Sequence, residues 1–209
     1  MGNNVGQLVI SNLHCLHIGP LDLTVDAGQC ISCSGPSGAG KSILLRAIID
    51  LIPNKGEVWL GEWQREQMRA SDWRKMVGLL PAESFWWCNQ VGPHFPALTE
   101  QQLGWFQSLG FDKQVLDWEV ARCSSGERQR LALLRLLCHG PKALLLDEPT
   151  ANLDSKTGLE LLNVMRTLNT EFEMTFIFST HDEKIMKMAT RLVSLVDGQI
   201  AGDERKAST

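Results

Sequence analysis

The residue types and spacing best suited to chemistry occur in the run GPSGAGKS at positions 35–42. It fits the pattern G-x-x-x-x-G-K-[ST], in which glycines let successive backbone N–H groups turn inward around phosphate oxygens. A helix beginning at the end of the run would add the positive end of its dipole. Lys41 would supply a cation, and the Ser42 hydroxyl a ligand for Mg²⁺. The residues expected to hold the phosphates are Gly35, Pro36, Ser37, Gly38, Ala39, Gly40, Lys41, Ser42 and Ile43.

Two carboxylates, Asp147 and Glu148, follow the apolar run ALLL at 143–146. Such a run is typical of a buried strand, and ligands of an open parallel sheet bind beyond the carboxyl ends of its strands. An acid pair in this place is also common in ordinary turns. Together with the phosphate loop, however, it favours Asp147 as a direct or water-mediated Mg²⁺ ligand. Glu148 would orient and partly deprotonate an attacking water.

The elements that position these residues alternate along the chain. We expect strands at 7–12, 21–25, 30–34, 57–61, 76–80, 143–146, 175–179 and 191–196. We expect helices at 42–51, from a capping box at 99–102 to Gly110, at 126–138, from 154 to about 168, and from Asp182. Strands that alternate with helices predict a mainly parallel sheet covered on both faces.

A third run, CSSGERQR at 123–130, is called here the signature segment. Ser124 and the following backbone N–H groups would form an anion site at a helix N-terminus. The segment resembles the signature of the ATP-binding cassette (ABC) ATPases, usually written LSGGQ. The matching residues are Ser124, Ser125, Gly126 and Glu127.

Other landmarks of this family occur in order along nearly the whole chain. Residues 149–154 (PTANLD) resemble its D-loop, and residues 179–182 (STHD) resemble its switch-histidine region. The resemblance implies that Lys41, Glu148 and His181 are catalytic, with His181 contacting the γ-phosphate and the attacking water. It also implies that the signature segment cannot reach the phosphate loop of its own chain. It would close over ATP held by a second ABC ATPase subunit, identical or not.

The resemblance further implies an α/β fold. A P-loop NTPase core, mainly parallel sheet with helices, would carry an N-terminal antiparallel β part and an inserted α-helical subdomain. A single ABC ATPase domain would span 1–209. Its core would comprise 1–82 and 141–209, and the helical subdomain, with the signature segment, 83–140. The implied ligands are ATP and Mg²⁺.

The chain departs from the family pattern at two places. Ala82 stands where a Gln that touches Mg²⁺ and the attacking water is expected, so Glu83 substitutes, Gln90 reaches in, or the contact is lost. The chain has no Tyr to stack on adenine. Counting from Asn12 puts His17 at that place, where an imidazole could stack or could be an ordinary loop residue.

Composition limits the remaining possibilities. A formal net charge of −4 argues against a nucleic-acid partner. No apolar run approaches the roughly 18 to 20 residues of a membrane-spanning helix, and we expect a cytoplasmic protein. Cys30 and Cys33 have the spacing of a metal knuckle, but strand neighbours three apart point to opposite faces. We therefore expect reduced structural thiols.

Three functions fit this pattern. The first is the nucleotide-binding subunit of an ABC transporter, peripheral on the inner face of the cell membrane through a separate integral-membrane permease. The second is an ABC ATPase of a non-transport machine, and the third a silent ATP-binding scaffold, which Glu148 and His181 disfavour. Aromatic residues crowd positions 85–87 (FWW). They form either the docking site of a permease helix or a small core beneath the insertion.

Overall fold

The computed structural model describes residues 6–151, 153–181 and 183–206. Its main sheet has the strand order β10-β9-β3-β8-β7-β6. The pairs β3–β8, β3–β9, β7–β8 and β6–β7 are parallel, and β9–β10 is antiparallel. The strands are β3 (Cys30–Ser34), β6 (Val77–Leu80), β7 (Ala143–Asp147), β8 (Thr175–Ser179), β9 (Arg191–Val196) and β10 (Gln199–Arg205). This is the mainly parallel sheet that the sequence predicts.

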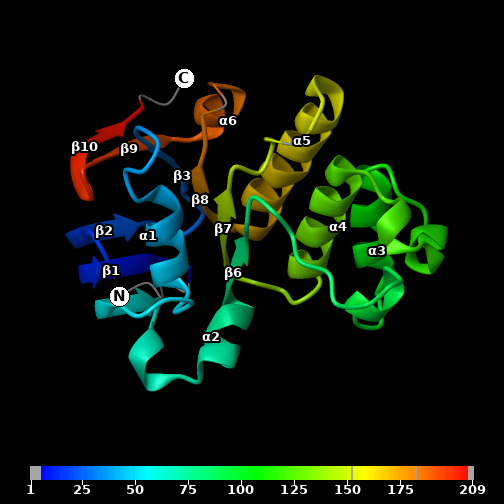
Figure 1. Cartoon of the computed structure of the whole chain (residues 1–209), viewed down its shortest axis with the longest axis horizontal. Coiled ribbons are helices and arrows are strands. Elements are labelled where there is room, and N and C mark those ends of the chain that lie inside the picture. Colours follow the sequence, from blue (N-terminus) through cyan, green and yellow to red (C-terminus); the bar gives the residue numbers. More distant parts are fainter. Residues whose placement is uncertain (1–5, 152, 182, 207–209) are drawn as a thin grey trace.

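A second, antiparallel sheet has the order β2-β1-β4-β5. Its strands are β1 (Leu8–Cys15), β2 (Ile18–Val25), β4 (Lys55–Leu60) and β5 (Trp63–Gln64). Helix α1 (Lys41–Ile48) lies beside this sheet (Figure 1) and packs into the same apolar cluster as β1, β2 and β4. The chain therefore places the helix that follows the phosphate loop between two sheets.

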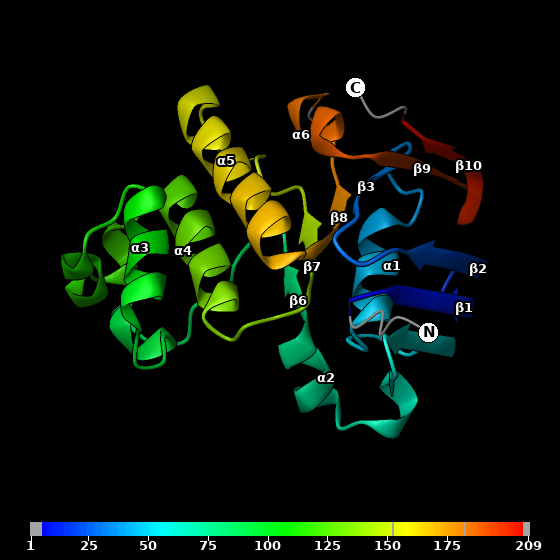
Figure 2. The same cartoon turned by 180° about the vertical axis from the view of Figure 1, so that it is seen from behind.

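The opposite face of the main sheet is covered by α4 (Ser125–Leu137) and α5 (Ser155–Phe172). In both views α3 (Glu100–Ser108) and α4 form a lobe beside α5 and apart from α1 (Figures 1 and 2). Helices α2 (Ala70–Met76) and α6 (Glu183–Met188) complete the set. Short 3-10 turns lie at Arg65–Gln67, Gly92–His94, Lys113–Asp117 and Val120–Arg122. The lobe is the inserted α-helical part of the predicted α/β fold.

The two faces of the sheet separate the apolar residues into two clusters. Leu145 and Ile177 pack with α1, whereas their strand neighbours Leu146 and Phe178 pack with α4 and α5. This alternation follows from the period of two along a strand. Both faces are buried, which explains why β7 and β8 appear in the sequence as apolar runs.

Several predicted boundaries need correction. Met76 belongs to the end of α2 and not to the following strand, and α1 ends at Ile48 because Asp50 turns into the left-handed region (φ 57°). Helix α5 continues to Phe172, and strand β10 was not predicted. The predicted starting residue of the last helix, Asp182, and Asn152 of the D-loop lie outside the described residues.

Candidate functional site

The phosphate loop joins the carboxyl end of β3 to α1. Gly35 (φ 142°) and Gly40 (φ 102°) hold it in conformations that favour glycine. A Cβ on Gly35 would lie 2.1 Å from the carbonyl oxygen of Leu195, and one on Gly40 would lie 2.3 Å from Cγ2 of Ile18. Both glycines are therefore required by close packing. Above Gly38, by contrast, a Cβ would meet no atom within 4 Å, so the loop borders open space there.

Lys41, the first residue of α1, is folded back onto this loop. Its Nζ donates hydrogen bonds to the carbonyl oxygens of Gly35 (2.8 Å) and Pro36 (3.0 Å), and only 8% of the residue is exposed. A cation is thus fixed inside the curve of the loop. Gly35 and Pro36 therefore contribute carbonyl oxygens that hold Lys41 in place. Ala39 is buried in the apolar cluster around α1.

Two hydroxyl groups converge on the carboxylate at the end of β7. Ser42 Oγ donates to Asp147 Oδ1 at 2.9 Å, and Ser179 Oγ donates to the same oxygen. Asp147 is 5% exposed, so these bonds replace much of its hydration. Ser42 and Asp147, the two residues predicted to hold Mg²⁺, lie side by side. Hydroxyl and carboxylate oxygens are ligands that this ion prefers.

Glu148 leaves the strand with a positive φ of 48°. Its backbone N–H donates to the carbonyl oxygen of Ser179 at 2.8 Å, which ties the turn to β8. Its Oε1 lies 3.6 Å from Nε2 of His181, and these side chains are 27% and 61% exposed. The carboxylate is consequently partly exposed to solvent and lies near an imidazole.

These residues share one cavity of about 280 Å³ beyond the carboxyl ends of β3, β7 and β8. His17 closes one side, where its Nε2 lies 3.3 Å from the carbonyl oxygen of Gly38. The lining consists of His17, Ser37, Gly38, Gly40, Lys41, Ser42, Ile43, Asp147, Glu148, Ser179 and His181. Residues from four separate segments of the chain thus meet where the sequence predicts the phosphates.

The signature segment lies elsewhere, since α4, which it opens, belongs to the lobe (Figure 1) and none of its residues lines this cavity. Ser124 caps α4 by accepting the N–H of Glu127 at 3.2 Å. Glu127 Oε2 accepts the N–H of Ser124 at 2.7 Å. That second bond lowers the pKa of Glu127 below its usual range. Ser124 and Ser125 are exposed, so this helix end faces outward.

The loop after β6 is called here the aromatic loop (residues 81–90). Ala82 is half-buried, Glu83 and Gln90 are exposed, and none of the three lines the cavity. Gln90 instead pairs with Glu119 in a β-bridge. The two replacements that the sequence offered for the missing Gln therefore lie away from the nucleotide cavity in this structure.

Cys30 and Cys33 do not form a metal knuckle. They lie on opposite faces of β3, Cys30 in the cluster around α4 and Cys33 in the cluster around α1. Burial raises the pKa of both thiols to about 12. Among the described residues, no group of three His, Cys, Asp or Glu side chains could hold a metal ion.

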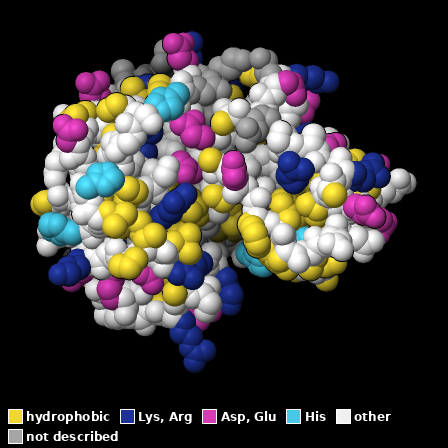
Figure 3. All heavy atoms as spheres, in the orientation of Figure 1, with side chains coloured by type: hydrophobic (Ala, Val, Ile, Leu, Met, Phe, Trp, Pro, Cys, Tyr) yellow, Lys and Arg dark blue, Asp and Glu magenta, His cyan; other side chains and the backbone are white. Residues whose placement is uncertain are grey.

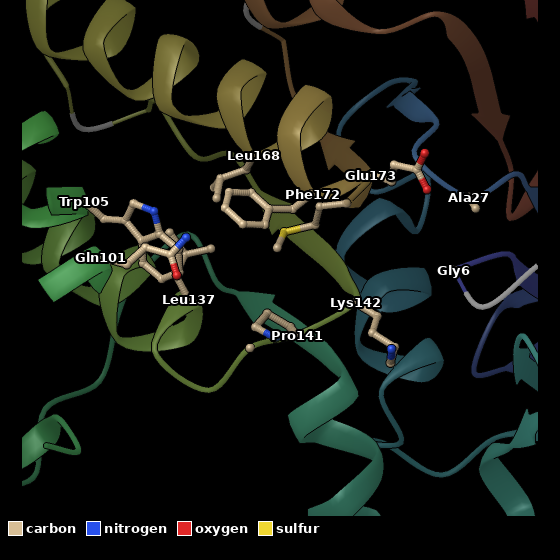
Figure 4. A pocket seen from close by; sticks show the side chains of 12 residues that line it. Gly6, Ala27, Gln101, Trp105, Leu137, Pro141, Lys142, Leu168, Phe172 and Glu173 are labelled. Atoms are coloured by element: carbon tan, nitrogen blue, oxygen red, sulfur yellow. The ribbon is translucent and has the colours of Figure 1, made fainter. Parts of the chain in front are cut away.

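A larger hollow of about 600 Å³ lies at the opposite, amino ends of β7 and β8. Figure 4 shows Trp105, Leu137, Leu168 and Phe172 around it. Its lining is mainly apolar, and it contains none of the residues that the sequence predicts for phosphate binding. Within the described ranges, no helix is long and apolar enough to span a membrane.

Ser179 is the cavity residue whose role the sequence did not suggest. It faces Asp147 in the parallel register between β7 and β8. The sequence shows a serine at the end of the strand that becomes β8. This serine could have been assigned to the site only if β8 were known to pair with β7, the strand that carries Asp147.

Comparison with known proteins agrees with this geometry. Residues 18–151 match the family model described as ABC transporter. The lipoprotein-releasing system ATP-binding protein LolD of Legionella pneumophila (strain Paris) is 31% identical over 206 residues, covering 88% of each chain. The aliphatic sulfonates import ATP-binding protein SsuB 3 of Pseudomonas savastanoi pv. phaseolicola (strain 1448A / Race 6) is 33% identical over 189 residues, covering 88% of this chain and 68% of that one.

A solved structure is also similar. The ATP-binding cassette MJ0796, in a dimeric post-hydrolysis state bound to ADP and Pi, superposes with a TM-score of 0.84 over 97% of this chain and 100% of its own, at 22% identity. At that identity the likeness shows the fold. The family match covers more than half of the chain, from the tip of the β1–β2 hairpin to the turn after Glu148. The chain therefore belongs to the ABC transporter family, as one of its ATP-binding, ATP-hydrolysing cassettes.

Proposed function

We propose that this chain powers an ABC transporter by closing as a dimer over two shared ATP molecules, beneath a separate integral-membrane permease. The observation that carries the proposal is the separation of two phosphate-binding features. Lys41, Ser42, Asp147 and Glu148 share one cavity, whereas the capped, exposed helix end at Ser124 lies in the lobe. A second subunit, identical or not, would bring its signature segment to this cavity.

The roles of the cavity residues follow from their positions. The loop N–H groups and Lys41 would bind the β- and γ-phosphates, and His17 would contact adenine. Ser42 and Asp147 would hold Mg²⁺, which would add positive charge at the phosphate oxygens. Ser124, Ser125, Gly126 and Glu127 of the other subunit would close over the γ-phosphate. In the structure described here, Ser124 and Glu127 of one chain already form the reciprocal cap that holds this helix end in shape.

In the hydrolysis step, Glu148 would accept a hydrogen bond from water and His181 would hold the γ-phosphate. Water oxygen bonds to the γ-phosphorus, and the bond from that phosphorus to the bridging oxygen breaks. The products are ADP and inorganic phosphate, and a proton of the water passes toward the Glu148 carboxylate. The half-buried position of Glu148, with its Oε1 3.6 Å from Nε2 of His181, supports these roles.

The lobe supports the permease part of the proposal. We divide the chain into a core, 1–82 and 141–209, and a helical subdomain, 83–140. On the subdomain, Phe85 is 74% exposed and Trp87 is at 62%. Figure 3 shows hydrophobic side chains on the face of the lobe that is turned toward the viewer. Exposed aromatic side chains of this size mark interaction surfaces.

Trp86 differs from its neighbour. It is half-buried and packs against the apolar cluster around α4. We therefore infer that Trp86 belongs to a small core, whereas Trp87 belongs to the docking surface. The names of the relatives refer to different cargoes, lipoproteins and aliphatic sulfonates. This fits a chain that supplies ATP chemistry and leaves the choice of cargo to the permease. Its place would be the cytoplasmic face of the membrane.

The test is affinity purification of the tagged chain from membranes of its own host. We expect a multi-spanning protein to co-purify and to stimulate ATP hydrolysis. Trp87→Ser should keep the melting temperature and basal ATPase while losing this partner, whereas Trp86→Ser should lower the melting temperature. Recovery of a soluble repair, translation or cell-division complex instead would favour a non-transport machine.

A further inference from the structure

The turn between β9 and β10 packs against the tip of the β1–β2 hairpin. Val196 pairs with Gln199, which leaves a turn of two residues. Both of them, Asp197 and Gly198, have a positive φ, 47° and 75°, as this kind of hairpin turn requires. The backbone N–H of Gly19 donates to the carbonyl oxygen of Gly198 at 2.9 Å, and Gln199 Nε2 donates to the carbonyl oxygen of Gly19. Two segments from opposite ends of the sequence are therefore held together.

The contact at Gly198 leaves no room for a side chain. A Cβ at this position would lie 2.2 Å from the carbonyl oxygen of His17 and 3.0 Å from Cα of Ile18. Both are main-chain atoms, which cannot rotate aside as the end of a flexible side chain can. The absence of a Cβ at Gly198 therefore determines how closely the turn approaches the backbone of His17.

The other side of the hairpin tip contacts the phosphate loop. Ile18 is buried, and its Cγ2 lies so close to Gly40 that a Cβ on the glycine would be 2.3 Å away. The ring of His17 reaches the same loop, since its Nε2 lies 3.3 Å from the carbonyl oxygen of Gly38. The hairpin tip is thus packed between the phosphate loop and the β9–β10 turn.

The inference rests on the proposed contact between His17 and adenine. We propose that the β9–β10 turn sets the position of the His17 ring relative to the phosphate loop, with Gly198 as the positioning residue for the nucleotide base. Strand β9 is the fixed side of this contact, because it pairs with β3 in the main sheet and the carbonyl oxygen of its Leu195 lies against Gly35. His17 lies exposed in a two-residue turn, so it is the side that yields.

Stacking is sensitive to such a displacement. A gap of about 0.5–1 Å already removes a quarter to a half of a dispersion contact. The phosphate contacts depend instead on the loop N–H groups and on Lys41, which Gly35 and Pro36 hold in place. A shift of the hairpin tip should therefore weaken binding of the base and spare binding of the phosphates.

Two ligands separate these contributions. MgADP carries the base and two phosphates, magnesium pyrophosphate carries the phosphates alone, and binding of neither requires the closed dimer. Isothermal titration calorimetry measures both. For Gly198→Ala we expect the affinity for MgADP to fall about fivefold, as for loss of one stacking face, and the affinity for magnesium pyrophosphate to stay unchanged.

Gly140→Ala is the matched control. Gly140 also has a positive φ, 65°, but a Cβ there would meet no atom within 4 Å. The two variants share the backbone strain and differ in the collision, so Gly140→Ala should bind both ligands as the wild type does. Gln199→Ala removes only the side-chain donor to Gly19 and should weaken MgADP binding alone, about twofold. It carries the test if Gly198→Ala does not fold.

A double variant tests whether Gly198 acts through His17. In His17→Ala protein the ring that the turn positions is gone, so adding Gly198→Ala should cause no further loss of affinity for MgADP. A merely structural role would add its full effect in this background. Full additivity would therefore overturn the inference.

The remaining contrary outcomes are distinct. Equal losses for MgADP and magnesium pyrophosphate would overturn the inference, because the turn would then act on the phosphate loop and not on the base. Unchanged MgADP affinity in folded Gly198→Ala protein would overturn it as well. Unchanged MgADP affinity in His17→Ala alone would contradict the adenine contact itself, and the inference with it.

Discussion

Ser42 Oγ donates a 2.9 Å hydrogen bond to Asp147 Oδ1, although 105 positions separate the two residues in the chain. The bond joins the first turn of α1 to the end of β7. It therefore fixes the phosphate loop against the acidic strand. Such preorganisation reduces the reorganisation that binding of a phosphate and a cation would require.

The second hydroxyl on Asp147 gives the first prediction. Ser179→Ala removes a donor to Oδ1 and leaves the carboxylate less firmly oriented, so the Mg²⁺ concentration for half-maximal ATPase should rise about fivefold, corresponding to about 1 kcal/mol. The measurement is a Mg²⁺ titration of turnover. Ser32→Ala is the control, because Ser32 Oγ is buried without a hydrogen-bond partner in the described structure. An unchanged Mg²⁺ dependence in Ser179→Ala would remove Ser179 from the site.

Lys41 is the buried cation of the phosphate loop. Lys41→Ala should weaken ATP binding at least tenfold, because a charge-assisted hydrogen bond contributes about 1.5–3 kcal/mol. Equilibrium binding of ATP without turnover is the measurement. Lys142→Ala, an exposed lysine at the other end of β7, is the control and should bind normally. Affinity within about twofold of wild type for Lys41→Ala would contradict the phosphate assignment.

His17 is the candidate contact for adenine. His17→Ala should weaken ATP binding by about 1 kcal/mol, and His17→Phe should restore it, because stacking needs an aromatic face and no hydrogen bond. His14→Ala, on the neighbouring strand and outside the cavity, is the control. If Phe fails to restore affinity that Ala loses, the bond between His17 and the Gly38 carbonyl oxygen carries the effect instead.

Ala82 offers a gain-of-function test. If this position has lost a contact to Mg²⁺ and the attacking water, Ala82→Gln should raise ATP turnover or strengthen its stimulation by a membrane partner. Steady-state ATPase at saturating MgATP checks this, with Ala82→Leu as a control of similar bulk without the amide. Equal rates in all three proteins would show that the chain compensates for this contact by other means.

The grouping of these residues around one cavity could be predicted because they lie in short, contiguous runs with fixed spacing. The loop at 35–42 and the acids at 147–148 each follow an apolar strand, and parallel pairing brings such strand ends to one edge. The order of the strands in the sheet, and therefore which strand ends are neighbours, could not be predicted. Ser179 became part of the site only because β8 lies between β3 and β7.

Strand β10 and the different exposure of two adjacent tryptophans were also not predicted. Strand β10 is mostly exposed and polar, so it lacks the apolar alternation that identifies a strand, although Asp197-Gly198 before it is a common hairpin turn. Trp86 packs against the apolar cluster around α4, whereas Trp87 stays exposed, and most residues of that cluster are distant from the loop in the sequence. No pattern within the loop itself contains that information.

Glu148→Gln tests the central claim most directly, since it removes the carboxylate that would accept a proton and keeps the shape of the side chain. We expect ATP binding to remain, hydrolysis to fall at least a hundredfold, as for loss of a general base, and a dimer to accumulate on a sizing column in MgATP but not in MgADP. Wild-type turnover, or a monomer at saturating MgATP, would contradict the account.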